Sequence, residues 1–213
     1  MNGERRSRRM MRWAGRLFAV GGASLLAYCG FVLWEAREFQ QQESLALDSI
    51  APLPIKPENP AAIGVRTVPG SLPVAIRRAP GLSGGLIGRV EVPRLDLSAI
   101  VIEGSDSVVL QRAVGHVPGT ALPGESGNIA ITGHRDTFFR PLRNIRQADL
   151  IRFTTPKEKF WYRVTSISVV APDDVAVLGA GKGEELTMIT CFPFSFVGAA
   201  PRRFVVRAER VGS

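Results

Sequence analysis

The chain has 213 residues, of which 45% are apolar and 22% are charged, and its net charge is +8. This length suits one domain with additional segments, and the composition excludes a collagen-like or wholly disordered chain. Two cysteines and two histidines, widely spaced, also exclude a zinc ribbon, an iron–sulfur site and a disulfide framework. Residues 1–16 supply +5 of the charge, from six arginines and one acid. A basic N-terminal segment before a chain of nearly balanced charge indicates a membrane-topology signal rather than a nucleic-acid-binding surface.

An uncharged run of 18 residues follows, at 17–34. As a helix it would be about 27 Å long, close to the hydrocarbon thickness of a bilayer. Trp13 and Trp34 flank the run, in the positions where interfacial aromatic residues gather. The sequence therefore predicts one transmembrane anchor at 17–34 after a basic cytoplasmic leader at 1–16. Because the positively charged flank stays inside, residues 35–213 are expected outside the cytoplasm.

Two other N-terminal signals share some of these features. A cleavable signal peptide has an apolar core of about 7–15 residues and a small-x-small cleavage site, whereas this run is longer and is followed by the charged residues of 35–38. A lipoprotein signal would use Cys29, but Tyr28 stands where a small residue is needed. The uncleaved anchor is the favoured interpretation, with Cys29 as a small apolar residue in lipid.

Residues 35–80 form the predicted juxtamembrane segment and linker. Residues 35–50 could continue as a short helix, and residues 52–80 hold seven of the chain's 15 prolines. So many prolines cannot propagate a helix or a central strand, and they favour a semi-rigid spacer. The folded domain is expected to begin near Gly81 and to occupy 81–213.

The domain at 81–213 has the pattern of a mainly β protein. Short apolar alternations are separated by Gly, Pro and Asp, and short helical patches fit 106–113 and 138–145. Seven or eight such strands favour a closed or nearly closed barrel. The candidate strands include 86–92, 95–101, 128–132, 150–154, 160–170, 186–191 and 203–211.

Cys191 is the one cysteine of this domain. It ends the strand pattern of 186–191 and is followed by Phe192 and Pro193, where the strand must stop. A thiol at a strand end that opens into a loop is well placed to act as a nucleophile, and a nearby histidine or cation would activate it. The alternative is a buried structural cysteine, because free cysteine packs well.

His134 and Arg203 suit the other roles of a thiol site. His134 follows a short apolar strand and a glycine and stands in a polar loop, whereas His116 is followed by turn residues that favour a packed or turn-stabilising imidazole. Arg202 and Arg203 open the strand that follows Cys191 in the sequence. A hairpin would return Arg203 beside Cys191, where a cation could stabilise an oxyanion.

These residues resemble the motifs of sortases, the membrane-anchored cysteine transpeptidases of bacterial surfaces. Residues 187–191 (TMITC) are similar to the family's T-L-x-T-C, with methionine in the place of leucine. Residues 127–134 (GNIAITGH) follow the pattern G-N-x-x-(I/V)-x-G-H, and residues 203–206 (RFVV) follow R-x-V-V. The resemblance covers about residues 85–211, and the sequence around the cysteine is most similar to class D and related sortases.

The resemblance implies a closed sortase-like β-barrel after the anchor, and a reaction without metal or organic cofactor. It implies that Cys191 attacks a C-terminal sorting motif on a secreted protein, usually of the Leu-Pro-x-Thr-Gly type, and that an amine at the cell envelope then takes the acyl group. His134 would act as general acid and base, and Arg203, supported by Thr190 and Arg202, would stabilise the oxyanion. The implied partners are this protein substrate, the amine acceptor and the membrane, with no nucleic acid.

Two alternatives stay open at this point. An L,D-transpeptidase-like thiol enzyme fits less well, because Thr190 rather than glycine precedes Cys191 and Pro193 follows closely. A membrane-anchored barrel that only binds peptide, without catalysis, would keep its function when Cys191 is replaced by alanine.

Overall fold

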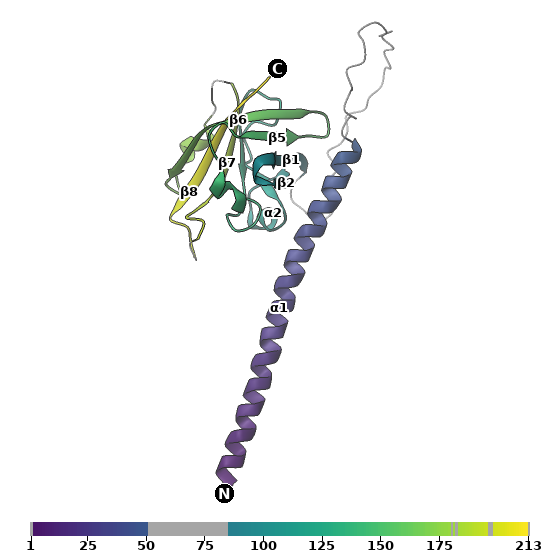
Figure 1. The fold of residues 1–213 in the computed structure, drawn as a ribbon, viewed down its shortest axis with the longest axis vertical. Helices are drawn as coiled ribbons and strands as arrows, with labels where there is room; N and C mark the ends of the chain where they lie inside the picture. Colours follow the sequence, from purple (N-terminus) through teal and green to yellow (C-terminus); the bar gives the residue numbers. More distant parts are fainter. Residues whose placement is uncertain (1, 51–84, 180, 182, 196–197, 213) are drawn as a thin grey trace. The chain divides into compact units, whose positions relative to one another are not determined.

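The computed structural model describes residues 2–50, 85–179, 181, 183–195 and 198–212 (Figure 1). The chain divides into two compact units, Met1–Phe39 and Gln40–Ser213. The proline-rich stretch of the predicted linker and the expected domain start at Gly81 lie outside the described residues.

The first unit is the larger part of helix α1, which runs over Asn2–Ile50. Its apolar side chains are exposed, for example 85% at Phe18 and 75% at Leu26. A long row of exposed apolar side chains is unfavourable in water but suits a lipid environment. Within Gly15–Asp48, a window of 18 residues has a mean hydropathy of 1.8, so the helix is long and apolar enough to cross a membrane. Helix α1 therefore has the character of a single-pass membrane anchor.

The last turns of α1 belong to the second unit and pack against it. Leu47 is fully buried. The Gln40 side chain donates to the Arg112 carbonyl at 2.8 Å and accepts from the Ile100 amide at 2.8 Å. Asp48 forms an ion pair with Arg89, with 2.8 Å between Oδ1 and Nη2. The end of this helix is thus an integral part of the folded domain, which the composition of residues 35–50 did not indicate.

In the described part of the chain, eight strands close into a barrel in the order β1-β2-β3-β4-β7-β8-β6-β5. All neighbours are antiparallel except the parallel pairs β2–β3 and β4–β7. This confirms the predicted closed barrel with short helices, although the sequence pattern had not indicated β3. The strands are β1 (Leu86–Val92), β2 (Leu97–Glu103), β3 (Val114–His116), β4 (Gly127–Thr132), β5 (Leu150–Thr154), β6 (Lys159–Val170), β7 (Glu184–Phe192) and β8 (Arg202–Arg210).

Short helices join the strands. Helix α2 (Ser107–Arg112) begins where the Asp106 side chain accepts hydrogen bonds from two backbone amides of its first turn, which would otherwise lack partners. The other three are 3-10 helices, and two of them start with proline near the first position, where no amide is needed. They are η1 (Pro93–Leu95), η2 (Arg140–Asn144) and η3 (Val175–Leu178).

Alternation along the strands separates the barrel core from its outer face. In β7, Leu186 and Met188 point into the core and are fully buried. Successive strand residues point to opposite faces, so Thr187, Ile189 and Cys191 lie on the outer face. In β8 the same rule places Val206 inside.

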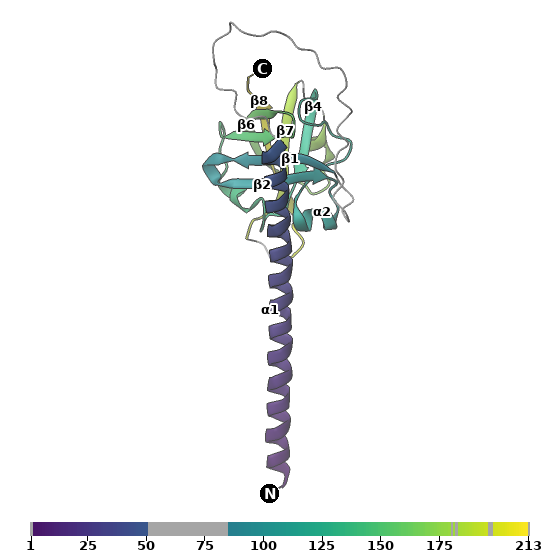
Figure 2. The ribbon, with the colours of Figure 1, turned by 90° about the vertical axis from the view of Figure 1, so that its right-hand side faces the viewer.

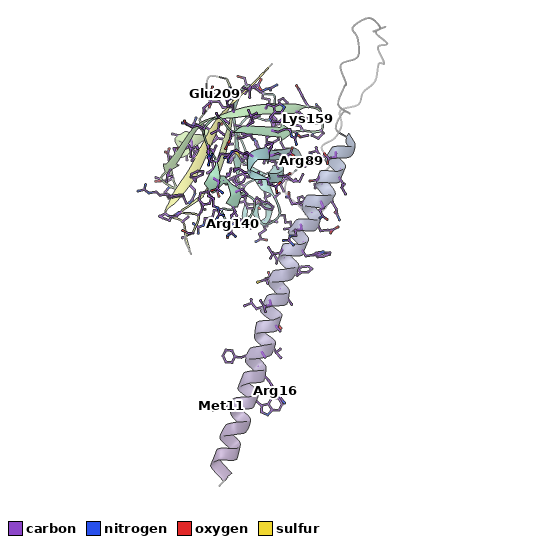
Figure 3. The ribbon with its side chains drawn as sticks, in the orientation of Figure 1. Met11, Arg16, Arg89, Arg140, Lys159 and Glu209 are labelled. Carbon is purple, nitrogen blue, oxygen red and sulfur yellow. The ribbon has the colours of Figure 1, made fainter. Side chains whose placement is uncertain are left out.

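Four strands, β1, β4, β6 and β7, run in the same direction, as their pairing requires. Their carboxyl-terminal ends therefore meet at one end of the barrel, which we name the carboxyl end. The loop after β4, helix η2 and the loop after β7 lie there. Figure 3 shows Arg140, the first residue of η2, at this end and Glu209, near the end of β8, at the opposite one.

Candidate active site

The β7–β8 hairpin brings Cys191 and Arg203 together. The two residues are direct partners in the antiparallel pairing. Directly paired residues share a face of the sheet, so both side chains emerge on the outer face of the barrel at its carboxyl end. Both are half-buried, and Cys191 is a free thiol. Arg202 pairs with Phe192 and lies on the opposite face. The register therefore favours Arg203 over Arg202 as the arginine of the site.

Strand β4 brings His134 to the same end, because it runs parallel to β7 with Thr132 opposite Ile189 (Figure 2). Gly133 continues this contact by donating from its amide to the Ile189 carbonyl at 3.2 Å. The carbonyl of Gly133 accepts from the Thr190 hydroxyl at 2.7 Å, in a buried position. These two bonds hold the residue before His134 against the residue before Cys191.

Position 133 leaves little room for a side chain larger than that of glycine. A Cβ there would lie 3.0 Å from the ring of Phe139, which is fully buried. A contact this short requires a neighbour to shift by a few tenths of an ångström, and the close packing of the core around Phe139 opposes such a shift. Gly133 thereby lets the loop turn tightly over Phe139 and leaves the His134 side chain exposed at the rim of the barrel.

Within the described residues, no hydrogen bond joins the Cys191 thiol to the His134 ring. The Arg203 guanidinium donates from Nη1 to the carbonyls of Ala200 and Arg202, at 3.3 and 3.2 Å. Its Nη2 and Nε groups donate to none of the residues that the structure describes. The site thus offers a thiol, an imidazole and guanidinium N–H groups at one rim, and no carboxylate in the described part of the chain pairs with the Arg203 guanidinium.

Residues 175–179, which contain η3, cover the outer face of β7 near Thr187, four residues before Cys191. Asn128 of β4 donates to the carbonyls of Val177 and Gly179, at 3.0 and 3.3 Å. The Asn128 carbonyl oxygen accepts from the Thr187 hydroxyl at 2.7 Å. Arg207 of β8 donates to the Val177 carbonyl at 3.2 Å. This segment is therefore fixed from two strands, as a wall beside the thiol strand.

The sequence pattern at 127–134 contains Asn128 but did not indicate a role for it. A signal was present, since a buried amide at an outward position of an apolar strand needs partners for each of its polar atoms. Asn128 is 2% exposed, and the wall segment together with Thr187 of β7 supplies those partners.

An aromatic group lies on the inner side of the same hairpin. Phe192, Phe194 and Phe204 have ring centroids 5.2 to 6.2 Å apart, in edge-on and stacked arrangements. Phe194 and Phe204 also pack on the core. Such pairs stabilise by about 0.5–1.5 kcal/mol beyond their buried area. They support the strand end that carries Cys191.

His116 is buried at 2% exposure and lies on β3, away from the thiol strand. Its Nδ1 is 2.8 Å from a Glu103 carboxylate oxygen, and its Nε2 is 3.0 Å from the Ala121 carbonyl oxygen. It is therefore the packed, turn-stabilising imidazole that the sequence suggested. No group of three or more histidine, cysteine or acidic side chains that could hold a metal occurs among the described residues.

Comparison with known proteins gives consistent matches. A family model of the sortase domain matches residues 90–211, more than half of the chain. Sortase D of Bacillus subtilis (strain 168) is 34% identical over 130 residues, which are 61% of this chain and 66% of that protein. Sortase SrtE1 of Streptomyces coelicolor is 30% identical over 203 residues, which are 85% of this chain and 53% of that protein. The chain thus aligns with between half and two thirds of these curated relatives.

Solved structures agree with this result. A sortase D5 transpeptidase of Clostridium perfringens matches with a TM-score of 0.55 and 30% identity, over 60% of this chain and 80% of that chain. Sortase A from Corynebacterium diphtheriae matches with a TM-score of 0.57 and 31% identity, over 62% of this chain and 64% of that chain.

Proposed function

Because the chain belongs to the sortase family, we propose that it is a membrane-anchored cysteine transpeptidase that cleaves a sorting motif of a secreted protein and transfers the acyl group to an amine. The observation that carries the proposal is the register of β7. This register pairs Cys191 with Arg203, and the parallel partner β4 ends in the loop of His134. The proposal takes these three chemically complementary side chains, which belong to one end of the barrel, as the reacting group.

In the first step the Cys191 thiolate attacks the carbonyl carbon of the scissile peptide bond. A thioester forms, the C–N bond breaks, and the leaving amine takes a proton from the His134 imidazolium. In the second step the neutral His134 accepts a proton from the incoming amine, which attacks the thioester. A new amide forms and the thiolate of Cys191 is released, so the enzyme ends in its starting protonation state.

Arg203 would stabilise the negative charge that develops on the carbonyl oxygen. Its guanidinium lies on the same face as Cys191, and its Nη2 and Nε groups are not engaged by the described residues. A preorganised donor of this kind contributes about 3–4 kcal/mol where one has been removed by mutation in other enzymes. Thr190 would act indirectly, through its bond to Gly133, and Arg202 would contribute positive charge at the strand start.

The anchor fits this activity. Helix α1 would hold the enzyme at the membrane, where secreted substrates emerge. The arginines of residues 1–16 favour a cytoplasmic N-terminus and a catalytic domain on the outer side. The expected partners are a secreted protein with a C-terminal sorting motif and an amine of the cell envelope.

The test is a mass-spectrometric search for an acyl-enzyme. The full chain in detergent is incubated with peptides of the Leu-Pro-x-Thr-Gly type and with variants at each position, with and without an amine acceptor. We expect an acyl adduct on wild-type protein and on Cys29→Ala, and none on Cys191→Ala. Peptide binding that is unchanged by Cys191→Ala, without any adduct, would instead favour a barrel that only binds peptide.

A further inference from the structure

Arg135, the neighbour of His134, connects the two loops of the candidate site. Its Nη1 donates to the carbonyl of Pro193 at 3.0 Å, and its Nη2 donates to the carbonyl of Gly198 at 3.1 Å. Both acceptors lie in the loop between β7 and β8, which begins directly after Cys191 and Phe192. Arg135 itself is half-buried. One side chain of the histidine loop thus binds the cysteine loop at two points.

The two bonds of Arg135 lie just beyond the bonds that join β4 to β7. The bonds of Gly133 with Ile189 and Thr190 tie β4 to β7 up to the residues just before His134 and Cys191. Beyond them Cys191 and Phe192 stay paired with Arg203 and Arg202 of β8, whereas His134 stands in the loop after β4, and loops are in general more mobile than the strands they connect. Without a further tie, the distance between imidazole and thiol would vary with the movement of the histidine loop.

The guanidinium group suits this task better than any other side chain. It is planar, it stays charged throughout the accessible pH range, and two of its amino groups can reach two carbonyls in a fixed geometry. Hydrogen bonds from a charged donor are also stronger than neutral ones. A lysine keeps the charge but offers a single nitrogen.

We propose that Arg135 is a positioning residue that holds the His134 loop against the loop that follows β7, and so holds His134 beside the strand end that carries Cys191. Because its Nη1 and Nη2 are engaged by protein carbonyls, it acts through His134 and Cys191 and does not bind the reacting carbonyl. The inference rests on the proposed function, since it assumes that these two residues work as a pair.

The first readout needs no substrate. It is the rate of Cys191 alkylation by iodoacetamide as a function of pH, measured on the full chain in detergent with Cys29→Ala as background. His134→Ala defines the pH midpoint of a thiol without its partner. We expect Arg135→Gln to shift the midpoint from the wild-type value toward that of His134→Ala, and Arg135→Lys to lie in between. Arg140→Gln, which changes an exposed arginine at the same end of the barrel, should keep the wild-type midpoint.

The second readout is acyl transfer from the peptide that the wild-type protein uses. Small displacements of reacting groups lower rates by about 10- to 100-fold. We therefore expect Arg135→Gln to lower kcat by about that factor with little change in KM, while thermal unfolding confirms that the variant is folded.

The outcomes separate the two proposals. If His134→Ala has the wild-type midpoint, the His134–Cys191 pair and with it the proposed mechanism are wrong. If His134→Ala shifts the midpoint but Arg135→Gln and Arg135→Lys both retain the wild-type midpoint and kcat, the pair stands and the role of Arg135 is refuted.

Discussion

The bond between Thr190 and Gly133 gives a sharp test of how the site is held together. The Thr190 side chain is 2% exposed, and its hydroxyl donates to the Gly133 carbonyl at 2.7 Å. Valine has the same shape but no hydroxyl, so Thr190→Val removes the donor and leaves no cavity. The Gly133 carbonyl then stays buried without this partner.

The cost follows from that unsatisfied carbonyl. Leaving a buried acceptor without its donor costs about 1–3 kcal/mol. For a domain of this size, each kcal/mol lowers Tm by about 3–5 °C. We therefore expect Thr190→Val to lower Tm by about 3–15 °C, and to lower acyl transfer as well, because the carbonyl that loses its partner directly precedes His134.

The assay is thermal unfolding followed by circular dichroism, with peptide cleavage measured on the same samples. Thr190→Ser is the matched control, because it keeps the hydroxyl and loses only a methyl group. The serine variant should retain more of the activity than the valine variant. Equal stability and activity of Thr190→Val and wild type would refute the view that this bond aligns the two strands.

Three further changes test other parts of the structure. Leu47→Ala should lower the free energy of unfolding by about 2–4 kcal/mol in denaturant titrations, because Leu47 is fully buried. Leu45→Ala is the control, since Leu45 is 71% exposed and its replacement should cost almost nothing. Equal costs would contradict the packing of the last turns of α1 against the domain. Burial raises the pKa of Glu91, but Arg152 and Arg89 outweigh this effect and hold the pKa below its usual 4.5. The ion pairs of Glu91 therefore stabilise the fold fully above pH 4.5, and this stabilisation is lost as the pH falls through the lowered pKa. Glu91→Gln should therefore cost about 1–2 kcal/mol at pH 7 and progressively less as the pH falls below 4.5, and a pH-independent difference would count against the ion pair. Arg203→Lys should lower kcat about 100-fold while Arg202→Lys stays near wild type, and the reverse pattern would move the oxyanion role to Arg202.

Sequence patterns predicted the elements whose signals are local. The uncharged run at 17–34 and its basic flank indicated the anchor, because lipid requires a long apolar helix. Apolar alternation indicated most strands of the barrel. The motif residues Cys191, His134 and Arg203 could be selected because each stands at a strand end, where alternation stops and a loop begins.

Other features depend on contacts between distant segments, and local patterns do not encode them. Strand β3 has three residues, too few to establish an alternation. Gln40 packs against the domain through Ile100 and Arg112, which lie 60 and 72 residues further along the chain. Residues 35–50 alone therefore gave no indication that this part of the helix docks there. The wall that Asn128 holds and the loop that Arg135 binds were missed for the same reason.

The charge, the scarcity of cysteine and histidine, and the motifs that resemble those of sortases were enough to predict an anchored thiol enzyme and to select its candidate residues. Which arginine shares a face with the thiol was decided only by the tertiary structure. The β7–β8 register pairs Arg203 with Cys191 and turns Arg202 to the other side. The physical reason is that a shift of one residue in pairing reverses the face of every side chain, and register is fixed by the packed core of the whole barrel.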